Sequence, residues 1–220
     1  MSSFISHSLA AMGVYSFARP RQRSLCPAQS IGQKLWLGWL VAIASLPDID
    51  YLIPALQSSA HQGARITHSI GVSLLLPVLT IVVLRVWGTR RQGRNAPMVQ
   101  IPIAQIPMDR IAMVQLVGAG LSHLVLDLLV GVKPLPLLWP LSTHPFRLSF
   151  GILPSAGRLV LSNYYFYRNL VIEMGVLLPL FYGLHLIRQR AFRTLRQRVA
   201  IALLFLCSAS FMYWAACLPR

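Results

Sequence analysis

The chain has 220 residues, of which 55% are hydrophobic and only 11% are charged. Soluble domains carry about 25% charged residues, so this composition excludes an ordinary soluble domain and indicates an integral membrane protein. The net charge is +15, from 20 Lys and Arg against 5 Asp and Glu. Because the basic residues cluster in short loops between apolar segments, the positive-inside rule accounts for the excess, and we expect no nucleic-acid partner.

The apolar pattern predicts an all-α integral membrane protein, a bundle of about five transmembrane helices plus a short N-terminal helix. The short helix is expected over residues 4–18. The predicted spans are residues 35–56, interrupted at Pro47, and residues 69–87, 111–130, 170–187 and 199–218. Trp36 and Trp39 near the start of the first span suggest a membrane interface there.

The span 111–130 contains His123 and Asp127, four positions apart. On a helix this spacing places both side chains on one face. An imidazole and a carboxylate in that arrangement are natural metal ligands, and ionisable groups inside a membrane helix usually mark a functional site. A structural hydrogen bond between two helices is the alternative. Gly118, Ala119 and Gly120 in the same span predict a close approach of a neighbouring helix.

Two further acids, Asp48 and Asp50, follow Pro47 inside the first apolar stretch. Unpaired carboxylates in such a place need a cation or must become neutral, so a cation site is favoured over a plain turn. His68 comes directly before the next span, where Thr67 or Ser69 is expected to cap the helix.

Charge bias predicts the topology. With the basic loops 19–34, 88–110 and 188–198 in the cytoplasm, the helices alternate so that most polar residues lie at the non-cytoplasmic end. His185 falls at the opposite end. The residues gathered together are His7, Asp48, Asp50, His68, His123, Asp127 and Glu173.

Mixed His and Asp ligands suit a divalent transition metal, with zinc favoured. The six His and Asp residues among those gathered exceed the three ligands that one tetrahedral catalytic ion takes from the protein. The site is therefore expected to hold one or two ions. Such ions activate water and hold the oxygens of a phosphoester. We expect one of Asp48 and Asp50 to bridge and the other to act as base or to orient a histidine. Arg147 is a candidate for contact with a substrate headgroup, whereas His61 and His144 are expected in water.

Four motifs carry a resemblance to a known family. They are Leu46-Pro-Asp-Ile-Asp50, Thr67-His68-Ser69, Ser122-His-Leu-Val-Leu-Asp127 and Leu137-Leu-Trp-Pro-Leu141. In this order they resemble the YdjM-type membrane-bound metal-dependent hydrolases, whose type member is described as a LexA-regulated inner-membrane protein. Gly63-Ala-Arg65 stands where that family commonly has His-Arg-Gly.

The resemblance covers roughly residues 1–150 and leaves 151–220 as further transmembrane helices of the same bundle. It implies a multi-pass protein of the bacterial inner membrane, and a metal-dependent hydrolase. It carries over six probable ligands: His7, Asp48, Asp50, His68, His123 and Asp127. Their order is also similar to that of zinc-dependent phospholipase C, which favours a phosphodiester and hence a lipid or small-molecule substrate.

Two rival functions stay open at this point. In one, the polar cluster only joins helices, and the protein is a non-catalytic membrane scaffold that binds partners. In the other, the intramembrane acids belong to a cation or proton transporter. The expected gathering of the polar residues at one end, rather than along a path across the membrane, speaks against transport.

Overall fold

The computed structural model describes residues 3–18, 27–51, 65–91, 109–131, 133–155, 163–189 and 193–218. Within these ranges every regular element is a helix, residues 133–155 are irregular, and the only β-type pairing is an isolated bridge between Leu135 and Phe146. This confirms the all-α prediction. The elements are α1 (Phe4–Ala18), α2 (Pro27–Ser45), the 3-10 helices η1 (Leu46–Tyr51) and η2 (Ile66–His68), α4 (Ile70–Arg91), α5 (Arg110–Val130), α6 (Tyr164–Arg188) and α7 (Leu195–Ala216).

Four helices, α4, α5, α6 and α7, are long and apolar enough to cross a bilayer, and they match four of the five predicted spans. α2 differs from the prediction. It begins at Pro27, inside what was expected to be a basic loop, and it ends at Ser45. Proline is well tolerated in the first turn of a helix. Pro47 follows two residues after the last turn, where its missing N–H and its ring oppose continuation.

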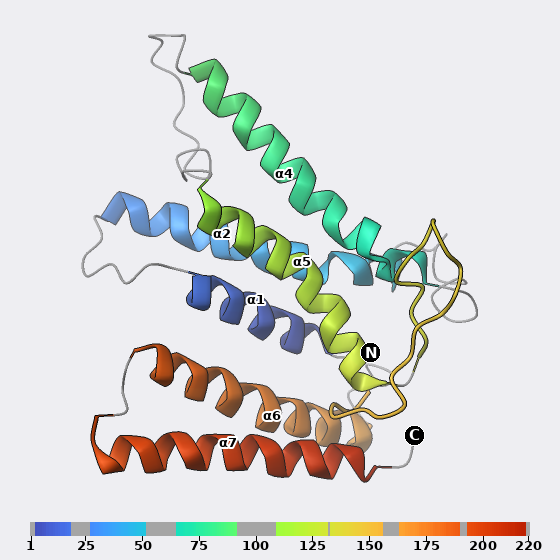
Figure 1. Ribbon diagram of the computed structural model, residues 1–220, viewed down its shortest axis with the longest axis vertical. Coiled ribbons are helices and arrows are strands. Elements are labelled where there is room, and N and C mark those ends of the chain that lie inside the picture. Colours follow the sequence, from blue (N-terminus) through green and yellow to red (C-terminus); the bar gives the residue numbers. More distant parts are fainter. Residues whose placement is uncertain are drawn as a thin grey trace.

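The helices run alternately between the two ends of the bundle (Figure 1). The starts of α1, α4 and α6 and the ends of α2, α5 and α7 lie at one end, together with both chain termini. We call this the polar end, because it holds the cluster described below. Helix termini with exposed basic residues, such as Arg110 and Arg188, lie at the opposite end.

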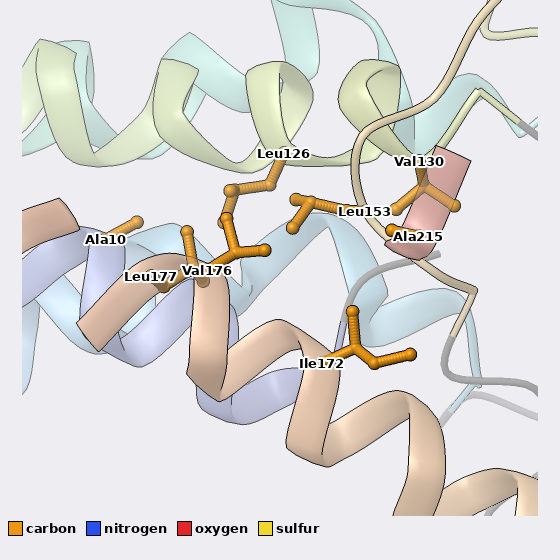
Figure 2. Packing of buried hydrophobic residues seen from close by; sticks show 8 residues of the cluster. All are labelled: Ala10, Leu126, Val130, Leu153, Ile172, Val176, Leu177 and Ala215. Carbon is orange, nitrogen blue, oxygen red and sulfur yellow. The ribbon is translucent and has the colours of Figure 1, made fainter. Parts of the chain in front are cut away.

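Helix α5 is central: it packs on α1, α2 and α4, while α1 also packs on α6, and α6 on α7. Two groups of buried apolar side chains hold this arrangement. One lies between α1, α2 and α5 and includes Trp36, Leu40, Ile43 and Leu116. The other joins α1, α5, α6, α7 and the segment after α5 (Figure 2): Ala10, Leu126, Val130, Leu153, Ile172, Val176, Leu177 and Ala215.

The small residues of α5 allow the close helix approach that was predicted for them. A Cβ added at Gly120 would lie 2.6 Å from the carbonyl oxygen of Ser73 in α4, so only glycine permits this approach. A Cβ at Gly118 would lie 2.9 Å from a methyl group of Val14 in α1. The bare backbone of α5 therefore lets both neighbouring helices come close.

Trp36 packs inside the bundle, and its depth in the membrane stays a prediction. Its side chain is buried, and its indole N–H donates to the Gln115 Oε1 atom at 2.7 Å. The Gln115 amide in turn donates to the backbone carbonyl of Tyr15 at 3.1 Å. A buried indole needs such an acceptor, and here the bonds join α2, α5 and α1. The residue therefore fixes helix packing.

Candidate metal centre

Five side chains with metal-ligating atoms converge at the polar end of the bundle. They form two overlapping groups whose donor atoms lie within 4.8 Å of one another, and His123 belongs to both. Four of the five are buried, and the Asp48 side chain is 22% exposed. They come from α1, η1, η2 and α5, and are His7, Asp48, His68, His123 and Asp127.

The local sequence explains how each residue reaches this place. Pro47 ends α2, and the following 3-10 turn carries Asp48 just beyond the helix end. Ser69 caps α4, since its hydroxyl accepts the Val72 N–H at 3.3 Å. Of the two predicted caps it is therefore the serine, and His68 lies immediately before the helix. His123 and Asp127 lie one turn apart on the same face of α5.

The ring nitrogens and carboxylate oxygens of these side chains face one another at short range. The Nε2 atoms of His68 and His123 are 3.1 Å apart. His68 Nε2 is 3.1 Å from Asp127 Oδ2 and 3.5 Å from Asp48 Oδ1. His123 Nε2 is 3.7 Å and 3.8 Å from the same two oxygens. His7 stacks on His123 with ring centroids 3.8 Å apart and completes the cluster.

Hydrogen bonds fix which nitrogen of two histidines carries the proton. The Nδ1 atom of His123 is 2.7 Å from the backbone carbonyl of Ala44, which can only accept, so this nitrogen carries the hydrogen. Thr67 donates its only hydroxyl hydrogen to Asp50 at 3.1 Å, and it must therefore accept from His68 Nδ1 at 3.0 Å. When neutral, both imidazoles therefore present a bare Nε2 lone pair to the cluster.

This assignment has a direct electrostatic consequence. With both rings neutral, two nitrogen lone pairs and two carboxylates face each other in a largely buried cluster, and they repel unless a cation lies among them. Histidines that bind a metal almost always donate their other ring N–H to a carbonyl or a carboxylate, directly or through a neighbour. His123 and His68 both have this support, so the donor set fits a divalent metal.

Arg65 forms ion pairs with both acids of the turn that follows α2. Its guanidinium donates to both oxygens of Asp50, at 2.7 and 2.8 Å, and to Asp48 at 3.2 Å. Arg65 and Asp50 are both buried. Planar two-point pairing of this kind suits a buried arginine and carboxylate. Asp50 lies in neither donor group. Its predicted role as a ligand stays a prediction, while its contact through Thr67 to His68 is that of an orienting group.

The neighbouring charges shift the pKa values of Asp48 and His68, which both precede α4. Burial raises the pKa of Asp48, but the hydrogen bond from His68 and the nearby His123 and His7 outweigh it and leave the pKa lowered. Burial lowers the pKa of His68, but hydrogen bonds to Asp127 and Asp48 outweigh it and leave the pKa raised above 6.5. The two nearby acids therefore favour a second proton on His68, at the Nε2 atom that faces them.

Glu173, expected in the cluster from topology, lies at the polar end but serves another purpose. Its carboxylate accepts from the Ser3 backbone N–H at 3.0 Å and from the Ser6 hydroxyl at 2.8 Å. These bonds satisfy free donors at the start of α1 and match its positive dipole end. Glu173 thus anchors α1, which carries His7, to α6.

The remaining predicted residues are placed as follows. Arg147 is exposed, and its Nε atom donates to the carbonyl of Gly131 at 3.0 Å, four residues beyond Asp127. His144 is exposed, as expected. His185 lies near the far end of α6 beside Gln189, away from the cluster. His61 and Gly63 lie outside the described residues.

Sequence reasoning missed three partners of the cluster. Arg65 was noted only as a departure from a motif, although a basic residue between acids and a histidine was a usable signal. Thr67 was considered only as a helix cap. The carbonyl of Ala44 left no signal, because any residue would supply it.

Comparison with known families identifies the family of the chain. The family model described as YdjM inner membrane protein matches residues 1–216, which include α6 and α7. No curated protein and no solved structure matches the chain. The chain belongs to the YdjM inner membrane protein family, and its buried His and Asp groups are of a kind that could hold a metal ion.

Proposed function

We propose that this YdjM family protein is a membrane-bound metal-dependent hydrolase that cleaves an ester or phosphoester bond of a bilayer lipid. The observation that carries the proposal is the facing pair of Nε2 atoms of His68 and His123, 3.1 Å apart, in two rings whose Nδ1 hydrogens are each held by a neighbouring acceptor.

We assign the metal, zinc first, to His68, His123 and Asp127, with His7 and Asp48 completing the set for one or two ions. His123 has one free lone pair and so serves only one ion. A divalent cation held there supplies Lewis-acid activation of water and of an ester or phosphoester oxygen.

Two acids, Asp48 and Asp50, have tasks beyond binding the metal. Asp48 is the cluster member with an exposed fraction, and its lowered pKa keeps it ionised near neutral pH. A lowered pKa makes it a weak base, so its place in the cluster and its access to water, rather than its basicity, make it the group that would accept the proton of an attacking water. Asp50, held by Arg65, orients His68 through the Thr67 hydroxyl. All these contacts exist before substrate binds, as preorganised catalysis requires.

The test is hydrolysis by the full chain, purified in detergent and loaded with zinc, against phospholipids and chromogenic phosphodiesters. Asp48→Asn should lower the rate by about 10²- to 10⁴-fold, the usual effect of losing a general base. His185→Ala, at the far end of α6, is the matched control and should keep full activity. Rates that are the same for wild type and Asp48→Asn would refute the assignment.

A structural role is the competing function, and one observation favours it. The cluster joins α1, η1, η2 and α5, and the bond between His68 and Asp127 at 3.1 Å is a good interhelical contact by itself. This scaffold function predicts that Asp127→Asn costs little stability, because intramembrane hydrogen bonds average about 0.6 kcal/mol. It also predicts no bound metal.

A further inference from the structure

The segment 133–155, which follows α5, is fixed against the two helix ends that carry the cluster. The N–H of Ile70, two residues after His68, donates to the carbonyl of Leu137 at 2.9 Å. On the other side, the Ile152 N–H donates at 2.9 Å to the carbonyl of Leu129, two residues after Asp127. The segment therefore crosses the polar end beside the cluster (Figure 1).

The surface of the segment carries large apolar side chains that are exposed. Leu135 and Leu153 are buried and hold it in place, while Leu141 is 92% exposed and Phe150 is 58% exposed. Leu138 and Phe146 are also exposed. Bare apolar side chains on an ordered segment indicate a contact surface rather than a loop in water.

The charge of the segment is of one sign. Lys133 and Arg147 are exposed, and residues 133–155 contain no Asp or Glu. Apolar side chains flanked by basic ones match the boundary of an anionic bilayer, where the acyl chains meet phosphate groups.

Aromatic residues place that boundary at the level of the segment. Exposed Tyr and Trp side chains collect at the bilayer interface, where the ring is partly in lipid and the polar atom is in water. They occupy the first turn of α6 and the last turn of α7, both at the polar end. These residues are Tyr164, Tyr165, Tyr167, Tyr213 and Trp214.

We propose that segment 133–155 lies in the bilayer interface and binds the headgroup phosphate of an anionic phospholipid through Lys133 and Arg147. Leu141 and Phe150 enter the acyl region, and the bound headgroup lies at the C-terminal end of α5, the helix that carries Asp127. That the lipid is also the substrate rests on the proposed function. The lipid contact itself does not.

The test places a fluorophore at Leu141→Cys in the full chain, with Cys26, Cys207 and Cys217 replaced by serine, in phosphatidylcholine vesicles. Arg193→Cys, exposed at the opposite end, is the reference position. We expect a nitroxide on a shallow acyl position to quench the label at 141 and iodide in the water to leave it bright. Iodide quenching as strong as that at 193 would overturn the proposal.

A second arm tests the charge. Nitroxide-labelled phosphatidylglycerol, diluted into phosphatidylcholine, should quench the label at 141 more than nitroxide-labelled phosphatidylcholine does. In the Lys133→Gln, Arg147→Gln double variant the preference should fall by up to about thirtyfold, since each surface cation contributes about fivefold. Lys133→Gln alone should show about a fivefold loss, and it leaves the bond from Arg147 to Gly131 intact.

No preference for the anionic lipid in the wild type would refute the charge contact. Hydrolysis is measured on the same preparations, so the two proposals fail separately. An active enzyme without lipid enrichment at position 141 contradicts this inference alone. Enrichment in a protein that hydrolyses nothing contradicts the proposed function alone.

Discussion

Replacing Thr67 by valine removes one hydroxyl from the hydrogen-bond chain that sets the protonation of His68. The hydroxyl donates to Asp50 at 3.1 Å and accepts from His68 Nδ1 at 3.0 Å. Valine has nearly the same shape, so packing changes little. Without the acceptor, His68 either keeps an unsatisfied buried N–H or moves its proton to Nε2. In the second case it can no longer bind a metal.

The expected cost follows from these contacts. An unsatisfied buried donor costs about 1–3 kcal/mol, which corresponds to a loss of about 5- to 150-fold in zinc affinity. Removing a group that orients a metal-binding histidine typically costs 10- to 100-fold, about 1.4–2.7 kcal/mol. Both routes therefore predict that the Kd for zinc rises by about 10- to 100-fold.

The assay is competition for zinc between the purified protein and a fluorescent chelator. Thr67→Ser keeps a hydroxyl and should retain most of the affinity. Thr80→Val tests for a general effect, because Thr80 is also buried and bonded, to Leu76 and Trp39, but lies far from the cluster. Wild-type zinc affinity in folded Thr67→Val would refute the assignment of the His68 proton.

Three other predictions follow from the same structure. Arg65→Met should lower stability by about 3–5 kcal/mol, seen as a lower melting temperature, because it leaves Asp50 buried without its cation; an unchanged melting temperature would contradict the ion pair. Zinc affinity should fall as pH falls, because the raised pKa of His68 means that a proton competes for its Nε2 from above pH 6.5 downwards; a pH-independent affinity would exclude His68 as a ligand. Gly120→Ala should destabilise the bundle by about 1–3 kcal/mol through a clash with α4, whereas Gly38→Ala, with open space around it, should not.

Much of this arrangement was predictable because the bilayer restricts the possibilities. Long apolar segments must become helices, and charge bias orders their direction. These two rules suffice to bring Asp48, His68, His123 and Asp127 to one end, as the structure has them. Their membrane face stays a prediction, because the fold alone does not orient the bundle.

What the sequence did not predict depends on contacts between elements. The backbone carbonyl of Ala44 has no sequence signature. Whether Asp50 is a ligand or the partner of Arg65 is decided by a few ångströms in the turn after α2. The start of α2 at Pro27 was missed because its first turns are polar and resemble a loop. Tertiary packing, rather than local pattern, settles each of these points.

The central claim is that the cluster holds a divalent metal, and metal content tests it most directly. Full-length protein, purified in detergent and loaded with zinc or manganese, is analysed by elemental mass spectrometry beside His123→Ala and the control His185→Ala. We predict near-stoichiometric metal in the wild type and in His185→Ala, and a loss of metal in folded His123→Ala. Metal-free wild-type protein, or a folded His123→Ala that keeps its metal, would contradict the account.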